Sequence, residues 1–180
     1  MKAGATKAAS NFTGGACPCG GYAAPDVSPS TGTVGRSVVA SVVAPVAPPR
    51  AAPAAKAARP KPAIAYPDCC RRFIEEGQIP TNAEQLMRSR YTAYVLERFD
   101  YLRDTWDPAT CPADLGSEAG PQWLGLEVRT HHQDDARHAT VEFVARYKVN
   151  GRAHRLHEVS RFTRADDGRW RYVAGTVSDS

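Results

Sequence analysis

Four of the five cysteines in this 180-residue chain form two close pairs, Cys17-Pro18-Cys19 and Cys69-Cys70. Four thiolates make a complete tetrahedral ligand set for zinc, an ion with no geometric preference of its own. A site closed by four protein ligands has no open position, so it stabilises structure and does not catalyse a reaction. The sequence therefore indicates a structural zinc site. Two alternatives stay open: incidental thiols, or a redox pair in which Cys69 and Cys70 form a strained disulfide.

The long separation between the two cysteine pairs weakens the predicted site. Loop-closure entropy grows with the logarithm of loop length, so a loop about six times longer than a compact one costs roughly 1.6 kcal/mol more. A structural zinc ion contributes about 10–16 kcal/mol of apparent binding free energy. The separation therefore lowers zinc affinity without abolishing binding. The fifth cysteine, Cys111, lies alone before Pro112 and is interpreted as a free thiol.

The segment between the cysteine pairs differs in composition from the rest of the chain. Residues 23–65 are rich in Ala, Pro and Val, contain no aromatic residue, and have prolines too closely spaced for a helix or a sheet. This composition predicts a disordered or polyproline-like insert. The predicted organisation is an N-terminal tail with the first half of the zinc motif at 1–22, the insert at 23–65, the second half of the motif at 66–79, and a packed domain at 80–180.

The net charge of +4 does not indicate a nucleic-acid-binding protein. The excess of basic residues lies in the insert, because residues 66–180 contain 16 basic and 18 acidic residues with the signs interspersed. No apolar run is long enough to span a bilayer, and none resembles a secretion signal. We therefore expect a cytoplasmic protein that binds neither nucleic acid nor membrane, in a reducing compartment where thiolates remain available to a metal.

Helical patterns follow the second cysteine pair. The run Thr81-Asn82-Ala83-Glu84 predicts a capping box, with the Thr81 hydroxyl and the Glu84 carboxylate satisfying first-turn donors. Asp100 is placed to cap a second, short helix that ends before Pro108. The first helix is expected to pack one stripe on the core and to present the opposite one to solvent; the stripes are Met87, Tyr91, Tyr94 and Val95 against Arg88, Thr92 and Glu97.

Strand patterns begin at Trp123, where apolar and polar residues start to alternate. Asn150-Gly151 predicts a type I′ turn between two strands and so fixes their register. Asp167-Gly168 predicts a second hairpin, with Gly175 opposite Ser160. Across the second turn, Val173 is also expected opposite Phe162, with Trp170 and Tyr172 on the outer face. The expected pairs across the first turn are Tyr147 with His154, Ala145 with Leu156, Phe143 with Glu158, and Val141 with Ser160.

The predicted register places Glu158 on the apolar face of the sheet. A carboxylate there is costly unless it is paired, and Arg88 and Arg90 are the candidate partners. Alternatively, Glu158 serves as a general acid or base beside His154 or Ser160. The remaining histidines, His131, His132 and His138, are interpreted as solvated residues around a polar turn. The sequence contains no phosphate-binding loop, nucleophile elbow or dinucleotide fingerprint.

Taken together, these motifs resemble the YchJ family of uncharacterised bacterial proteins. Its cysteine pattern resembles the SEC-C motif, named for the zinc-binding C-terminal segment of the SecA translocation motor, which implies that Cys17, Cys19, Cys69 and Cys70 are zinc ligands. The resemblance departs from the family pattern at Gly21 and Arg71, and at the long insert. It is carried by Cys17-Pro18-Cys19-Gly20, Cys69-Cys70, Ala83 to Tyr94, Val141 to Tyr147, Leu156 to Phe162 and Asp167 to Trp170.

The resemblance also implies an α+β fold of the nuclear-transport-factor-2-like type, in which helices pack in a curved antiparallel sheet and form a conical pocket. We expect a zinc-binding module that binds a protein partner through the zinc motif, with a small ligand in the pocket and a homodimer as further options. The alternative is a small-molecule enzyme of isomerase, dehydratase or hydrolase type that uses Glu158. The pocket candidates are Arg88, Tyr91, His154, Glu158 and Ser160.

Overall fold

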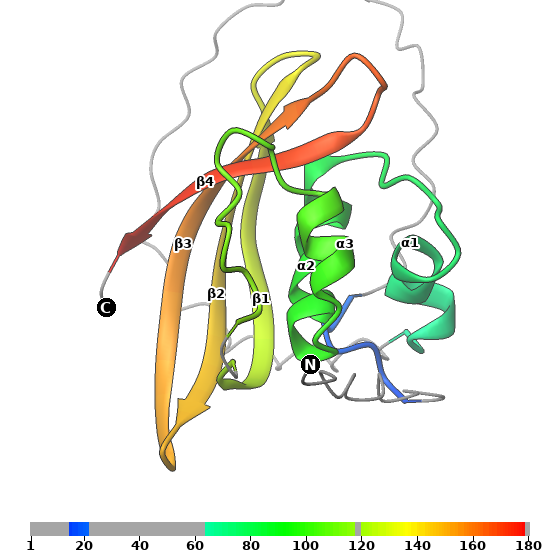
Figure 1. Ribbon diagram of the computed structural model, residues 1–180. Helices are drawn as coiled ribbons and strands as arrows, with labels where there is room; N and C mark the ends of the chain where they lie inside the picture. Colours follow the sequence, from blue (N-terminus) through cyan, green and yellow to red (C-terminus); the bar gives the residue numbers. More distant parts are fainter. Residues whose placement is uncertain (1–14, 22–63, 118–119, 179–180) are drawn as a thin grey trace, which may run out of the picture. The chain divides into compact units, whose positions relative to one another are not determined.

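The computed structural model describes residues 15–21, 64–117 and 120–178, and its main element is a four-stranded antiparallel sheet (Figure 1). Helix α2 (Ala83–Val95) lies between this sheet and the short helix α1 (Arg72–Ile74), and α3 (Phe99–Asp104) packs beside α2. The predicted α+β fold is confirmed. The strands pair in chain order and are β1 (Gln122–Gln133), β2 (His138–Val149), β3 (Arg152–Arg164) and β4 (Trp170–Ser178).

The turn at Asn150-Gly151 sets the register of the central hairpin as predicted. Both residues have positive φ, 49° for Asn150 and 81° for Gly151, as a type I′ turn requires. The four predicted cross-strand pairs between β2 and β3 are all present, including Phe143 with Glu158 and Val141 with Ser160. Glu158 therefore lies on the face of the sheet that α2 covers.

A β-bulge in β4 overturns part of the prediction for the last hairpin. Gly175 pairs with Ser160 as expected, but the register shifts after Arg161, so Phe162 pairs with Tyr172 and not with Val173. The extra residue turns Tyr172 toward the helices, where its ring contacts Phe162 at a centroid distance of 5.7 Å. Trp170 is likewise buried and donates its indole N–H to the Thr81 carbonyl. The predicted outer-face position of Tyr172 and Trp170 is wrong.

Helix α2 begins one residue later than the predicted capping box implies. Asn82 is the N-cap, and its side chain accepts a hydrogen bond from the backbone N–H of Gln85 at 2.9 Å. The Gln85 side chain reaches back to the N–H of Thr81 at 3.0 Å. Glu84, the predicted capping carboxylate, instead pairs with Arg88. The N-cap and the side chain that reaches back to it thus each lie one residue later in the chain than predicted.

Of the three residues expected to face solvent, Thr92 is buried, Arg88 is half-buried and Glu97, just past the end of α2, is exposed. Met87 and Tyr91 are buried as predicted, but Ser89, Arg90 and Thr92 are also at most 3% exposed. The hydroxyl of Thr92 lies 3.7 Å from the Cys17 sulfur, so the cysteine segments cover the side of α2 that the sheet does not. None of the helices in the described ranges is long and apolar enough to cross a membrane.

Candidate metal centre

Two short backbone segments pair to form the first half of the site. The N–H of Cys17 donates to the Ile64 carbonyl at 2.8 Å, and the N–H of Ile64 donates to the Gly21 carbonyl at 3.3 Å. Ala16 and Ala65 form an isolated antiparallel bridge. Composition alone assigned Ile64 and Ala65 to the end of the insert, so the ordered motif begins earlier than predicted. The rest of the predicted insert lies outside the described residues.

The second half of the site is the wide turn η1 (Pro67–Arg71), which carries Cys69 and Cys70. Pro67 suits the first position of this turn, because a backbone N–H at that position would have no acceptor within the turn. The N–H of Arg71 donates to the Tyr66 carbonyl at 3.2 Å, an i→i+5 bond that is wider than an α-helical one. A wider turn rotates less per residue, so the neighbouring Cys69 and Cys70 side chains can converge on one point.

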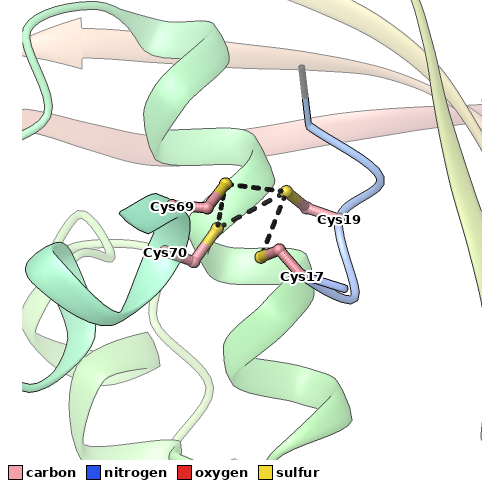
Figure 2. Close-up of side chains that lie close together, drawn as sticks. All are labelled: Cys17, Cys19, Cys69 and Cys70. Atoms are coloured by element: carbon pink, nitrogen blue, oxygen red, sulfur yellow. Dashed lines mark hydrogen bonds between the residues drawn. The ribbon is translucent and has the colours of Figure 1, made fainter. Parts of the chain in front are cut away.

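The four sulfurs gather at the junction of these segments (Figure 2). Cys19 Sγ lies 3.5 Å from Cys17 Sγ, 3.6 Å from Cys69 Sγ and 3.5 Å from Cys70 Sγ. The Cys69 and Cys70 sulfurs are 3.8 Å apart, and all four lie within 4.8 Å of one another. Two sulfurs bound tetrahedrally to one zinc at about 2.3 Å lie about 3.8 Å apart. The spacing of the sulfurs therefore fits a tetrahedral thiolate site.

Neighbouring groups fix the cysteine loop around these sulfurs. The N–H of Gly21 donates to Cys19 Sγ at 3.2 Å, and a Cβ at Gly21 would lie only 3.0 Å from that sulfur. Arg88 donates to the Cys19 carbonyl at 3.1 Å and pairs with Glu84 at 2.8 Å. Its positive charge would offset part of the negative charge of a four-thiolate site. Arg88 therefore supports the cysteine cluster and does not reach Glu158.

The crowded thiols have strongly displaced acidities. Hydrogen bonds from neighbouring thiols, the one from Cys19 being the largest, lower the pKa of Cys17. Hydrogen bonds with Cys17 and Cys19, together with burial, raise the pKa of Cys70. Hydrogen bonds from neighbouring thiols can therefore stabilise a single thiolate, such as that of Cys17. Four adjacent thiolates would repel one another. Only a bound cation would keep all four deprotonated.

The redox alternative has no support in this geometry. All five cysteines are free, and the 3.8 Å between the Cys69 and Cys70 sulfurs far exceeds a disulfide bond of about 2.05 Å. Cys111 lies apart from the cluster, with its sulfur 3.8 Å from the Pro112 carbonyl. Within the described residues, the four cysteines are the one group of three or more His, Cys, Asp or Glu side chains arranged to hold a metal.

We expect the long connection between Gly21 and Ile64 to be replaceable. These two residues are already hydrogen-bonded across antiparallel segments, as are the residues that flank a two-residue hairpin turn. A variant with Asn-Gly in place of residues 22–63 should fold normally and bind zinc more tightly, by up to about 1.6 kcal/mol. Competition with a chromogenic chelator and circular dichroism measure the two effects. A weaker zinc affinity or a lost fold would show that the removed segment packs on the site.

Glu158 is held by hydroxyl groups and not by an arginine. Its Oε1 accepts hydrogen bonds from Ser160 Oγ at 2.6 Å and from the Tyr172 hydroxyl at 3.1 Å. Burial, with a contribution from Glu158, raises the pKa of Tyr172, so this tyrosine remains a donor. Gly175 leaves the space that the Glu158 carboxylate occupies, because a Cβ there would overlap it. The predicted ion pair with Arg88 or Arg90 is wrong within the described part of the chain.

The other pocket candidates do not converge on Glu158. Tyr91 packs edge-on against Trp123 at a centroid distance of 5.6 Å, and burial raises its pKa to about 12. His154 is exposed and stacks on Tyr147 at 5.3 Å. Of the five predicted residues, Glu158 and Ser160 come together. Tyr172 was missed, because the bulge that turns it inward has no signal in the alternation of apolar and polar residues.

The three histidines that were interpreted as residues around a polar turn differ in exposure and in contacts. His132 and His138 are exposed as expected, and they pair with Asp134 at 3.4 Å and Asp135 at 2.8 Å. The side chain of His131 differs from these two: its Nδ1 lies 4.0 Å from Glu84, and its Nε2 is buried with no hydrogen-bond partner in the described part of the chain. The prediction of a solvated side chain is therefore wrong for His131, and the prediction of a loop position is wrong for all three histidines, which lie on β1 or β2.

We expect Glu158→Gln to change stability by less than about 1.5 kcal/mol, because the amide oxygen of Gln can still accept both hydroxyl hydrogen bonds. Glu158→Leu is the matched contrast, since it leaves the buried Ser160 and the Tyr172 hydroxyl without their acceptor. That variant should lose about 1–3 kcal/mol. Urea unfolding measures both. Equal, large losses in the two variants would mean that the charge of Glu158 is what stabilises the fold.

Comparisons with known proteins agree with this architecture. A family profile described as "YchJ, middle NTF2-like domain" matches residues 82–175, which begin at the N-cap of α2 and end in β4. A UPF0225 protein of Ralstonia nicotianae is 56% identical over 133 residues, covering 68% of this chain and 92% of the relative. The match to this relative is thus longer than the 82–175 segment that the family profile covers.

Two solved structures are similar in fold to about two thirds or more of this chain. The solution structure of a SEC-C motif containing protein from Rhodopseudomonas palustris is 33% identical, with a TM-score of 0.58 over 67% of this chain and 95% of that chain. The crystal structure of a SEC-C motif containing protein from Psychrobacter arcticus is also 33% identical, with a TM-score of 0.56 over 72% of this chain and 80% of that chain. Both titles name the motif that the paired cysteines resemble.

Proposed function

The chain belongs to the YchJ family, also described as UPF0225, and from this premise we propose that it is a cytoplasmic zinc-binding protein whose cysteine module docks a protein partner. The observation that carries the proposal is the set of four sulfurs, spaced 3.5–3.8 Å along their close contacts. Solved structures with the same fold are described as containing a SEC-C motif.

Zinc is favoured over other metals by the ligand set. Four thiolates without any oxygen or nitrogen ligand select soft or borderline ions, and a tetrahedral arrangement is typical of structural zinc. Three of the four cysteines are at most 3% exposed, so the site has little room for a water ligand or a substrate. This supports a structural role, in which the ion joins the segments 15–21 and 64–71 and fastens them to α2.

The decisive experiment is native mass spectrometry of protein purified without added metal, combined with elemental analysis. We expect one zinc ion per chain, and the same spectra report whether the protein is a monomer or a homodimer and whether it retains a ligand. Freshly reduced protein with no bound metal, although correctly folded, would overturn the proposed zinc site. Oxidative loss of the metal is excluded by measuring free thiols in the same sample.

The proposed docking surface is formed by exposed residues that follow Cys69 and Cys70 in the chain. Ile79, just after α1, is an exposed large apolar side chain (47%), and the neighbouring Arg71, Glu75 and Glu76 are exposed and charged. A photo-crosslinking residue at Ile79 should capture a discrete partner in cells, whereas the same residue at Val149, exposed to 41% at a hairpin turn, should not. Identical products from both positions, or unchanged products in a variant lacking Cys69 and Cys70, would contradict docking through the module.

The arrangement around Glu158 supports a second candidate function, a small-molecule enzyme. Two hydroxyl groups orient one carboxylate on the helix-covered face of the sheet, as a general acid or base requires. Because Glu158→Gln is expected to fold normally, it separates the two functions. Loss of an identified turnover in that variant, with zinc content unchanged, would favour the enzyme.

A further inference from the structure

Basic side chains gather on the outer face of the sheet, opposite the face that α2 covers, near the turn that joins β2 and β3. Arg146 of β2 lies directly opposite Arg155 of β3, and Lys148 is two residues closer to the turn on the same face. All three are exposed. Figure 1 shows this turn at the end of the sheet away from the other two strand turns. Arg146, Lys148 and Arg155 are called the basic cluster below.

The two facing arginines lower the stability of the sheet. Residues directly opposite each other on antiparallel strands have Cβ atoms about 4.5–5.5 Å apart, and like charges at such positions are destabilising. An uncharged polar residue in place of either Arg146 or Arg155 would remove this repulsion. Exposed residues that act against the fold point to a use outside it.

No carboxylate within the described ranges neutralises the basic cluster. The strands carry two carboxylates on this face, and both have other partners: Glu127 pairs with Arg129 at 3.2 Å, and Glu142 pairs with His157 at 2.8 Å. The cluster side chains themselves have no ion pair or hydrogen bond to any residue that the structure describes. Their charge is therefore available to another molecule.

The acidic turns at the opposite end of the sheet are poor partners for the cluster of a second copy. Asp166 pairs with Arg137 at 2.8 Å, and Asp167 pairs with Arg171 at 3.0 Å. These charges are already balanced within one chain, so two copies would gain little by bringing the turns onto the basic cluster. The complementary charge is therefore expected from a different molecule.

The guanidinium of Arg146 lies against β1. Its cross-strand neighbour there is Gly125, and a Cβ at that glycine would lie 3.8 Å from Nη2 and 4.0 Å from Nε of Arg146. With no side chain at position 125, the guanidinium has room next to the strand. Guanidinium donors form a fixed, planar fork that matches the two oxygens of a carboxylate. Arg146 is thus positioned for a carboxylate.

The spacing within the cluster suits an extended peptide. Arg146 and Lys148 are two residues apart on one strand, which separates them by about 6.8 Å, and an extended peptide presents alternate side chains at the same interval. Nucleic acid fits less well, because proteins that bind it combine a long basic groove with stacking on aromatic rings. The aromatic residues of the described strands belong to the core or contact a core ring, so none is offered on this face.

We propose that the basic cluster binds an extended acidic segment of a partner protein, with Asp or Glu at alternate positions. Arg146 and Arg155 share one carboxylate, which relieves their mutual repulsion, and Lys148 receives the carboxylate two residues along the segment. The cluster is separate from the cysteine module, so this inference depends neither on zinc binding nor on a partner docked there.

The test uses the full-length protein with two peptides, Glu-Thr-Glu-Thr-Glu-Thr and its neutral counterpart Gln-Thr-Gln-Thr-Gln-Thr. We expect the acidic peptide to shift the backbone amide resonances of Arg146 and Arg155 saturably. Its affinity should fall at least about tenfold between about 20 and about 200 mM salt, because exposed charges are screened. No saturable shift, equal binding of the two peptides, or tighter binding of a single-stranded oligonucleotide of equal charge would each overturn the proposal.

Paired variants locate the binding site. Arg146→Gln/Arg155→Gln should weaken binding of the acidic peptide by at least about tenfold. Arg161→Gln/Arg169→Gln removes the same charge from two exposed arginines outside the cluster, so it should leave binding unchanged. Unchanged binding in the first variant, or equal losses in both, would mean that the peptide responds to the net charge of the chain and not to the cluster.

Arg155→Glu separates a role in binding from a role in the fold. It places opposite charges directly across β2 and β3, so the variant should melt at a higher temperature and lose the acidic peptide. A lower melting temperature would mean that Arg155 serves the stability of the sheet, and retained binding would mean that it does not serve the ligand. Either result contradicts the proposed role.

Discussion

In a Cys69→Ser/Cys70→Ser variant, we expect bound zinc to fall from one ion per chain to near zero and the segment 15–21 to detach from α2. The two thiolates are half of the ligand set, and hydroxyl groups are poor zinc ligands at neutral pH. Because the ion contributes about 10–16 kcal/mol of apparent binding free energy, its loss removes the main link between the two cysteine segments. Elemental analysis and hydrogen exchange at residues 15–21 measure the two effects.

Cys111→Ser is the matched control for this variant. Its sulfur is bonded within its own loop and not to the cluster, so zinc content and melting temperature should match the unmodified protein. Full zinc in the double variant would contradict the assignment of the ligands. Zinc loss without any change in exchange at residues 15–21 would mean that backbone hydrogen bonds alone hold this segment in place.

Arg90→Met is expected to lower the free energy of unfolding by about 3 kcal/mol. The guanidinium lies 4.6 Å from the Trp106 ring and 4.7 Å from the Tyr172 ring, and its Nη1 donates to the Leu102 carbonyl and the Thr105 hydroxyl at 2.9 Å each. Burial lowers the pKa of Arg90, but a guanidinium remains protonated at neutral pH. Methionine fills a similar volume and makes none of these polar contacts, each of which contributes about 0.5–3 kcal/mol.

Two further substitutions make the Arg90 measurement specific. Arg90→Lys keeps the charge but loses the planar stacking, so it should recover only part of the stability. Arg129→Met replaces an exposed arginine that pairs with Glu127, and it should change stability by less than about 0.5 kcal/mol. Urea unfolding gives the values. Equal effects at Arg90 and Arg129 would show that the buried guanidinium contributes nothing beyond its volume.

Local chemistry explains which parts of the fold the sequence predicts. Asn150-Gly151 requires a specific turn, and a turn fixes every pair along the strands that it joins, so the β2–β3 register was predictable. The β4 bulge was not, because an extra residue leaves the composition of the strand unchanged. With it, the inward positions of Tyr172 and Trp170 were missed.

Tertiary contacts explain what the sequence did not predict about the candidate site. The cysteine cluster was visible because four soft ligands of one type are rare in a chain. The partners of Arg88, Arg90 and Glu158 depended on which elements meet: Arg88 faces the cysteine loop, and Arg90 lies between two rings. Both arginines were interpreted as partners of Glu158 because periodicity gives the face of a helix but not its neighbours.

The position of α2 between the cysteine segments and the sheet has a consequence for biosynthesis. All four cysteines of the cluster precede every strand that the structure describes. On a ribosome that adds about 5–20 residues per second, Cys70 is made roughly 5–20 s before the end of β4. During that interval the nascent chain carries a complete set of thiols and no sheet to cover the other side of α2. A metal held by these thiols would therefore join the cysteine segments before the sheet forms, so metal supply during translation would bear on how this chain reaches its fold.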